Sequence, residues 1–140
     1  MEETKINNNF IFMACDIQGE ADSNMAKYLT DHAGLIQYST KLVQLAKASN
    51  NPLIIVEGNA KTFGHTAEAL LKSIGLETEQ YDGYADGQAF IHEKCSFSML
   101  EDEKTRARFF EFFDKEKTVA VLFGLLTEAC ILKSVISLRQ

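Results

Sequence analysis

The chain has 140 residues, 46% of them hydrophobic, and a formal net charge of -6 from 14 basic and 20 acidic side chains. Length and composition are typical of one globular domain and exclude a disordered or collagen-like chain. The negative charge disfavours nucleic-acid binding, which depends on clustered Lys and Arg. No apolar run approaches the roughly 20 residues of a membrane span. The polar, acidic N-terminus does not resemble a signal or transit sequence. Three widely spaced cysteines do not form a disulfide framework. From both observations we expect a cytoplasmic protein.

Four apolar stretches predict β-strands. Their hydrophobicity is continuous rather than alternating, which is typical of strands buried on both faces of a parallel sheet. Each stretch ends at a charged residue or at glycine, which marks where the chain leaves the sheet. The predicted strands cover residues 10–15, 52–56, 89–92 and 118–123.

Helical periodicity fills the segments between these strands. Gly75 ends one helix, and Ser98 with Glu101 has the spacing of a capping box at the start of another. Phe109, Phe110 and Phe113 predict a core-facing stripe on that helix. The predicted helices cover residues 24–48, 65–74, 99–116 and 127–140.

The alternation of strands and helices predicts a three-layer α/β/α fold with a parallel sheet. In such sheets ligands bind beyond the carboxyl ends of the strands. Asp16, Lys94 and Cys130 follow three of the predicted strands, so a carboxylate, an ammonium and a thiol can converge there. If Thr127 caps the last helix, Cys130 lies in its first turn, where the helix dipole lowers the pKa of a thiol. Backbone N–H groups at the same helix start can bind an oxyanion.

Four motifs, in order along the chain, resemble those of the isochorismatase-like cysteine hydrolases, in the branch of the isochorismatase-domain-containing proteins. The first is Asp16-Ile-Gln18, and the second is the segment from Glu57 to Thr66. The third runs from Lys94 to Met99 as Lys-Cys-Ser-Phe-Ser-Met. The fourth is Gly-Leu-Leu-Thr-Glu-Ala-Cys, residues 124–130. Each motif is weak alone, and the resemblance depends on all four.

The resemblance implies a catalytic triad of Asp16, Lys94 and Cys130. In the family, Cys attacks a carbonyl carbon, Asp manages the proton and Lys promotes the thiolate, on a small amide-like or ester-like substrate without a cofactor or a metal. The resemblance also places Gln18, Leu126 and Thr127 in substrate binding or the oxyanion hole. In relatives a cis peptide lies at the position of Leu125–Leu126. We therefore expect Cys130 to be the most reactive thiol, and Lys94→Met to raise the pKa of Cys130 with the fold intact.

Departures from the family pattern leave alternatives open. Nicotinamidases of this superfamily carry an Asp-x-His-x-His-like metal cluster, whereas this chain has only His65 in that region. Leu126 and Glu128 replace the usual Glu and His at the pocket rim, which is compatible with an inactive member that serves as a binding or interaction protein. A phosphoacceptor receiver domain is disfavoured because Asp16 has no acidic neighbour, and a P-loop NTPase is excluded because its phosphate-binding motif is absent.

The family sheet has six strands in the order 3-2-1-4-5-6, and the chain supplies candidates for four of them, in the order 3-2-1-4. We expect a single domain over residues 1–140 that lacks the last two strands, with strand 118–123 at an edge. An apolar edge without charges or proline favours pairing with another chain. The sequence therefore predicts either a homo-oligomer or a fragment of a longer protein, with a small molecule as substrate and no nucleic-acid or membrane partner.

Overall fold

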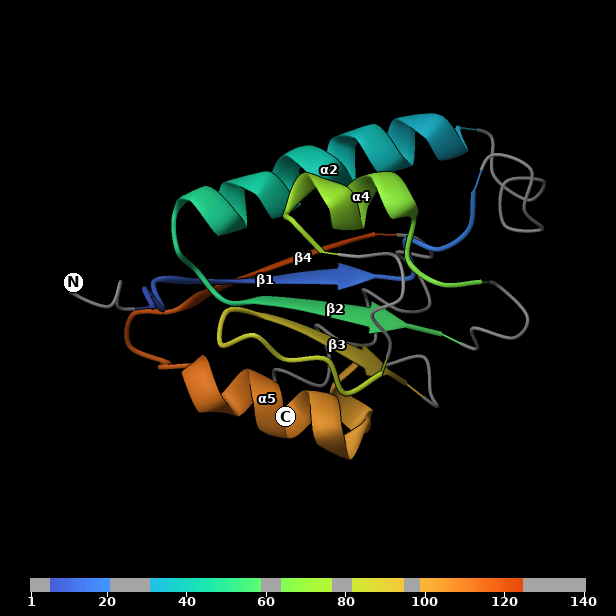
Figure 1. Ribbon diagram of the computed structural model, residues 1–140. Helices are drawn as coiled ribbons and strands as arrows, with labels where there is room; N and C mark the ends of the chain where they lie inside the picture. The colour runs from blue at the N-terminus through green and yellow to red at the C-terminus, as the bar shows by residue number, and fades with distance from the viewer. Residues whose placement is uncertain (1–5, 21–30, 59–63, 77–81, 95–98, 125–140) are drawn as a thin grey trace.

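The computed structural model describes residues 6–20, 31–58, 64–76, 82–94 and 99–124. They form three layers, with helices α2 and α4 on one face of a β-sheet and α5 on the other (Figure 1). This confirms the predicted α/β/α architecture. In chain order the elements are β1 (Phe10–Cys15), α2 (His32–Ala48), β2 (Leu53–Glu57), α4 (Glu68–Ser73), β3 (Ala89–Glu93), the 3-10 turn η1 (Met99–Glu101), α5 (Glu103–Phe112) and β4 (Val119–Gly124).

The sheet is parallel and has the predicted order, β3-β2-β1-β4, in the part of the chain that the structure describes. Strand β1 is central and pairs with β2 on one side and β4 on the other. Cys15, its last residue, lies opposite Val56 of β2 and Gly124 of β4. Because the strands are parallel, all four carboxyl ends meet at one edge of the sheet.

Both faces of the sheet are buried, as the continuous apolar runs predict. Side chains of Phe12, Ala14 and Ile55 face α2 and α4, while those of Met13 and Ile54 face α5. From Ile11 onward β1 is buried along its whole length. Strand β4 is less covered, and Val119 at its start is 54% exposed. Among the described residues, β4 pairs only with β1.

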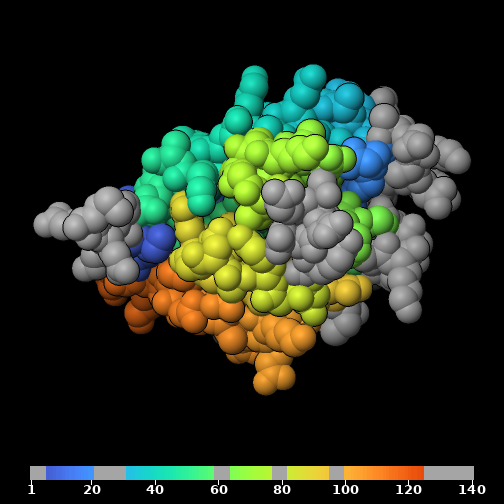
Figure 2. Space-filling view, in the orientation of Figure 1, coloured from blue at the N-terminus to red at the C-terminus, as the bar shows by residue number. Residues whose placement is uncertain are grey.

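The outer edge of β3 is covered by the segment that precedes it. The Gly83 N–H donates to the Ile91 carbonyl at 2.8 Å, and the Ile91 N–H donates to the Tyr84 carbonyl at 3.0 Å. In the space-filling view this yellow segment lies between the α4 layer above and α5 below (Figure 2). Backbone groups at that edge are therefore paired within the chain, which protects it from edge-to-edge association.

Helix α4 starts three residues later than predicted, at Glu68. Residues 65–67 instead bind the chain that leaves β1: the Gly19 N–H donates to the His65 carbonyl and the Ala67 N–H to the Ile17 carbonyl, both at 3.0 Å. Gly75, with a φ of 80°, follows the helix as predicted. For α2, the structure describes residues from Asp31 onward, and the Asp31 side chain caps the helix by accepting from the Gly34 N–H at 2.9 Å. The predicted start near residue 24 lies outside the described residues.

The helix predicted over residues 99–116 is shorter. Asp102 caps α5 by accepting a 3.1 Å hydrogen bond from the Thr105 N–H. At the other end Phe113 has an extended conformation, and the Thr118 N–H donates to the Asp114 carbonyl at 2.7 Å. The chain therefore turns toward β4 before residue 116. Ser98 lies outside the described residues. None of the described helices has the length and apolarity needed to cross a membrane.

The predicted phenylalanine stripe is wrong in one member. Phe109 is fully buried against the sheet, whereas Phe110 is 52% exposed. Phe113 packs on the Phe109 ring at 4.9 Å between centroids, but it follows the helix rather than continuing it. Phe112 and Phe113 pack against the buried cluster on this face, which we call the α5-side core. Phe110 points away from it, because successive residues of an α-helix are separated by more than a quarter-turn. The α5-side core consists of Ile11, Met13, Cys15, Ile54, Val56, Phe90, Leu100 and Phe109.

His92 of β3 is buried on the α5 face of the sheet, and neither ring nitrogen has a hydrogen-bond partner among the described residues. Burial lowers the pKa of His92 below its ordinary value of 6.5, and the nearby Arg108 guanidinium lowers it further. The carboxylates of Asp82 and Asp102 oppose this effect by raising the pKa of His92, and the Lys104 ammonium adds to it by lowering the pKa.

This burial predicts acid destabilisation. The unfolded chain binds a proton at His92 near pH 6.5, whereas the folded chain does so only at lower pH. The contribution of His92 to the free energy of unfolding should therefore be constant above about pH 6.5 and fall as the pH drops below it. Urea unfolding of the wild type and of His92→Met between about pH 7.5 and about pH 5.5 measures this, and the variant should lose much of the pH dependence. Parallel curves for the two proteins would contradict the prediction.

Candidate active site

Asp16 and Lys94 form a buried ion pair at the carboxyl edge of the sheet. Lys94 Nζ lies 3.1 Å from Asp16 Oδ2, and the two side chains are only 4% and 6% exposed. Asp16 follows β1 and Lys94 follows β3, so the end of β2 lies between them. The Asp16 N–H donates to the Val56 carbonyl at 3.0 Å, and the Lys94 N–H donates to the Glu57 carbonyl at 2.8 Å. The structure thus brings together two of the three residues predicted to react.

The backbone at Asp16 turns sharply out of the sheet. Its φ of 57° lies in the left-handed region, which Asp and Asn adopt more readily than other residues with side chains. Residues held in this conformation are concentrated at functional sites, where the surrounding structure enforces it. The turn ends β1 at Cys15 and places the carboxylate of Asp16 at the sheet edge.

Cys15 is a third member of this polar cluster. Its Sγ lies 3.4 Å from Asp16 Oδ2 and 3.6 Å from Lys94 Nζ, and the residue is fully buried. Cys15 also belongs to the α5-side core. The contacts with Asp16 and Lys94 were not predicted. The available signal was that Cys15 directly precedes Asp16 in a strand whose alternate residues face α5.

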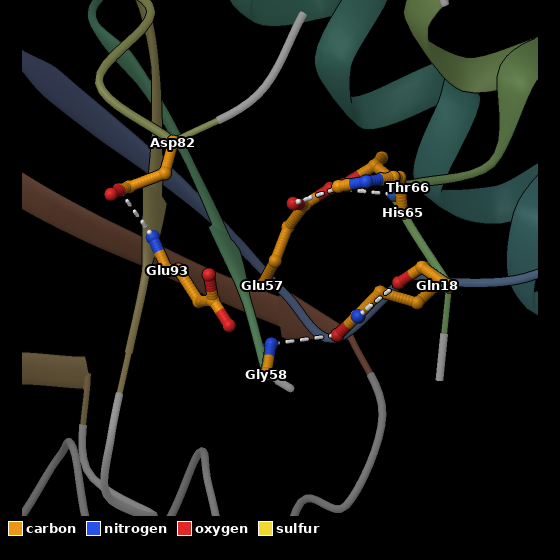
Figure 3. Close-up of polar contacts among 8 residues, drawn as sticks. Gln18, Glu57, Gly58, His65, Thr66, Asp82 and Glu93 are labelled. Carbon is orange, nitrogen blue, oxygen red and sulfur yellow. Dashed lines mark hydrogen bonds and ion pairs between the residues drawn. The ribbon is translucent and has the colours of Figure 1, made fainter. Parts of the chain in front are cut away.

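Gln18 joins two segments beside the ion pair. Its Oε1 accepts from the Gly58 N–H at 2.7 Å, and its Nε2 donates to the Gly64 carbonyl at 2.5 Å (Figure 3). The residue is 1% exposed. Both ends of the side-chain amide therefore bind backbone, and they hold the chain after β2 against the chain after β1.

Glu57, at the end of β2, organises the same region. One carboxylate oxygen, Oε2, accepts from the Thr66 N–H at 2.6 Å and from its hydroxyl at 2.7 Å, while Oε1 lies 3.2 Å from His65 Nδ1 (Figure 3). Glu57 is buried, and these hydrogen bonds compensate its desolvation. The sequence did not assign this role to Glu57. Among the described residues, no three His, Cys, Asp or Glu side chains are grouped so that they could hold a metal ion.

The remaining predicted site residues, Leu126, Thr127 and Cys130, lie outside the described residues, as does the Leu125–Leu126 peptide. The last described residue is Gly124, which lies opposite Cys15 in the sheet. Cys130 follows Gly124 by six positions, a distance of at most about 20 Å along an extended chain. The length of the intervening chain therefore allows the predicted nucleophile to approach the Asp16–Lys94 pair.

No protein-family model matches the chain. Its sequence is similar to that of isochorismatase family protein 1A from Dictyostelium discoideum, with 27% identity over 133 residues. The match covers 95% of this chain and 57% of the relative. The chain therefore spans little more than half the length of the curated relative that it matches.

Solved structures share the fold at lower sequence identity. The MAR1 ribonuclease from Caenorhabditis elegans superposes with a TM-score of 0.71 and 22% identity over 98% of this chain and 60% of that protein. An isochorismatase from Pseudomonas putida superposes with a TM-score of 0.69 and 14% sequence identity, over 98% of this chain and 68% of that protein. For an isochorismatase family protein from Burkholderia thailandensis the TM-score is 0.57 and the sequence identity 12%, over 95% of this chain and 73% of that protein. The chain therefore has the fold of these isochorismatase-like structures and is similar in sequence to a Dictyostelium protein of the isochorismatase family.

Proposed function

We propose that this chain carries the catalytic residues of an isochorismatase-like hydrolase that acts on a small amide-like or ester-like substrate, with Cys130 as the nucleophile. The observation that carries the proposal is the buried Asp16–Lys94 pair at the carboxyl edge of the sheet. A buried pair of opposite charges costs desolvation energy and is a poor device for stability alone. Its position where α/β proteins bind ligands favours a chemical role.

In the proposed mechanism the Cys130 thiol transfers its proton to Asp16, and the Lys94 ammonium stabilises the resulting thiolate. The sulfur attacks the substrate carbonyl carbon, and backbone N–H groups at Leu126 and Thr127 stabilise the oxyanion. Asp16 returns the proton to the departing amine or alcohol, which leaves a thioester on Cys130. Water, deprotonated by Asp16, then hydrolyses the thioester and regenerates the thiol.

Gln18 and Glu57 support the rim of this site in the proposal. Since both ends of the Gln18 amide bind the backbone at Gly58 and Gly64, Gln18 contributes to substrate binding through the segments that it joins. The Glu57 carboxylate likewise holds the neighbouring segment, through the ring of His65 and the backbone N–H of Thr66. Both side chains thus act by shaping the region around Asp16.

Two other functions stay in competition. The name of the Caenorhabditis relative makes RNA a candidate substrate, although the net charge of -6 opposes binding to a polyanion. A binding or interaction protein without catalysis is the second alternative. Leu126 and Glu128, where related hydrolases carry Glu and His, favour it.

A substrate panel separates these functions. Small amides, ureides, esters and a single-stranded RNA are incubated with the wild type, Cys130→Ala and, as a matched thiol control, Cys95→Ala. We expect the wild type and Cys95→Ala to hydrolyse at least one small substrate with an acyl adduct on the Cys130 peptide by mass spectrometry, and Cys130→Ala to be inactive. Full activity of Cys130→Ala, or cleavage of RNA alone, would contradict the proposal, and binding without turnover would favour the interaction protein.

A further inference from the structure

Three buried polar side chains close a triangle at the carboxyl edge of the sheet. The sides of the triangle are 3.1 Å from Lys94 Nζ to Asp16 Oδ2, 3.4 Å from Cys15 Sγ to the same Oδ2, and 3.6 Å from Cys15 Sγ to Lys94 Nζ. Counted over the whole residue instead of the side chain alone, the exposed fractions are 0% for Cys15, 4% for Asp16 and 8% for Lys94. Each member therefore contacts both others out of water, where such contacts are stronger than at a surface.

A thiol suits this position because it is both a weak donor and a weak acceptor. Its S–H donates to the carboxylate oxygen of Asp16, and its sulfur lone pairs accept from the ammonium of Lys94. The rest of the side chain is small and apolar, so it also packs in the α5-side core.

Packing alone does not require a thiol here. Val56 lies opposite Cys15 in the sheet and is buried in the same α5-side core. An aliphatic side chain therefore fits this end of the sheet where no polar contact is made. What distinguishes Cys15 from Val56 is its contact with the charged pair.

Burial also excludes Cys15 as a nucleophile toward a dissolved substrate, because its exposed fraction is 0%. Any effect of the thiol on the reaction has to pass through Asp16 and Lys94. Hydrogen bonds to a charged partner are stronger than those between neutral groups. A buried group that hydrogen-bonds to residues at a reacting centre commonly sets the orientation of those residues.

We propose that Cys15 is a positioning residue, which fixes the Lys94 ammonium and the Asp16 carboxylate relative to each other and thereby sets how strongly the pair promotes the thiolate of the nucleophile. The inference rests on the proposed function in one respect, the assignment of the nucleophile to Cys130. Without the thiol, the ammonium and the carboxylate each lose one buried contact that limits their movement.

The test measures the rate of iodoacetamide labelling of Cys130 against pH, with each cysteine peptide quantified by mass spectrometry. The variants are Cys15→Ala, Cys15→Ser and Cys15→Val, with Val56→Ala as a matched control. This control opens a cavity in the same core and removes no polar side-chain contact of the pair, because the hydrogen bond from the Asp16 N–H goes to the Val56 backbone carbonyl. Since the carboxylate and the ammonium each lose one weak hydrogen bond to the thiol, Cys15→Ala should slow labelling at neutral pH by about fivefold and move the profile to higher pH. Cys15→Ser keeps a donor and an acceptor and should remain within about twofold of the wild type.

Cys15→Val serves as the second apolar variant if Cys15→Ala does not fold, and it should show the same shift. Circular dichroism and urea unfolding report folding for each protein. Val56→Ala should lose stability and keep the wild-type labelling profile. An unshifted profile in both apolar Cys15 variants, or an equal shift in Val56→Ala, would reduce Cys15 to a core residue and overturn the inference. An inert Cys130 in the wild type would instead overturn the proposed function, so the two failures are distinguishable.

Discussion

Replacing Gly124 with alanine should destabilise the fold by more than about 3 kcal/mol. A Cβ at this position would overlap the carbonyl oxygen of Cys15 and lie 2.8 Å from its carbonyl carbon and 2.9 Å from its nitrogen. These are backbone atoms of the central strand, so they cannot move aside as a side chain does. Gly124 also has a φ of 133°, which residues with a Cβ rarely adopt. Urea unfolding followed by circular dichroism measures the loss.

Gly87→Ala is the control for conformational strain. Gly87 has a φ of 94°, but a Cβ there would have no neighbour within 4 Å. We expect this variant to lose about 1 kcal/mol from backbone strain alone. Equal losses in the two variants would show that close packing of Gly124 against Cys15 does not decide the geometry at the end of β4.

Lys94→Met should lower the free energy of unfolding by about 3 kcal/mol and slow the labelling of Cys130 near neutral pH. Removing the ammonium leaves the Asp16 carboxylate buried without its ion-pair partner. The sequence predicts only a change in thiol reactivity with the fold intact, and the burial of both side chains adds the stability cost. The double variant Asp16→Asn/Lys94→Met removes both charges and should be less destabilised than the sum of the single variants. Urea unfolding and the pH profile of labelling measure the two effects.

Lys104→Met is a matched control for removal of a lysine charge. Lys104 Nζ lies 3.5 Å from Asp82 Oδ2, but its side chain is 69% exposed and that of Asp82 is 37% exposed. An ion pair in this setting contributes little, so the change in stability should stay below about 0.5 kcal/mol. If Lys94→Met were as mild as Lys104→Met, the buried pair would not be the organising interaction of the site.

The elements of this fold are readable from the sequence because their signals are local. Continuous apolar runs locate β1 to β4 within a residue of their observed bounds, and Gly75 marks the chain's turn after α4. Helix boundaries are less readable, since α4 begins only after residues 65–67 have bound the chain beyond β1. The exposure of Phe110 has a different reason: it follows Phe109 by one residue, so within α5 its side chain points more than a quarter-turn away from the buried face.

The sequence alone determined that Asp16 and Lys94 follow strands of a parallel sheet, and therefore that they share one edge. Only the tertiary structure decided that they form a buried pair, that Cys15 touches both, and that Gln18 binds backbone at both ends of its amide. The physical reason is that periodicity reports which way a side chain faces within one element. Contacts between residues as far apart as Cys15 and Lys94 depend on the strand register and on the left-handed turn at Asp16, which no local pattern encodes.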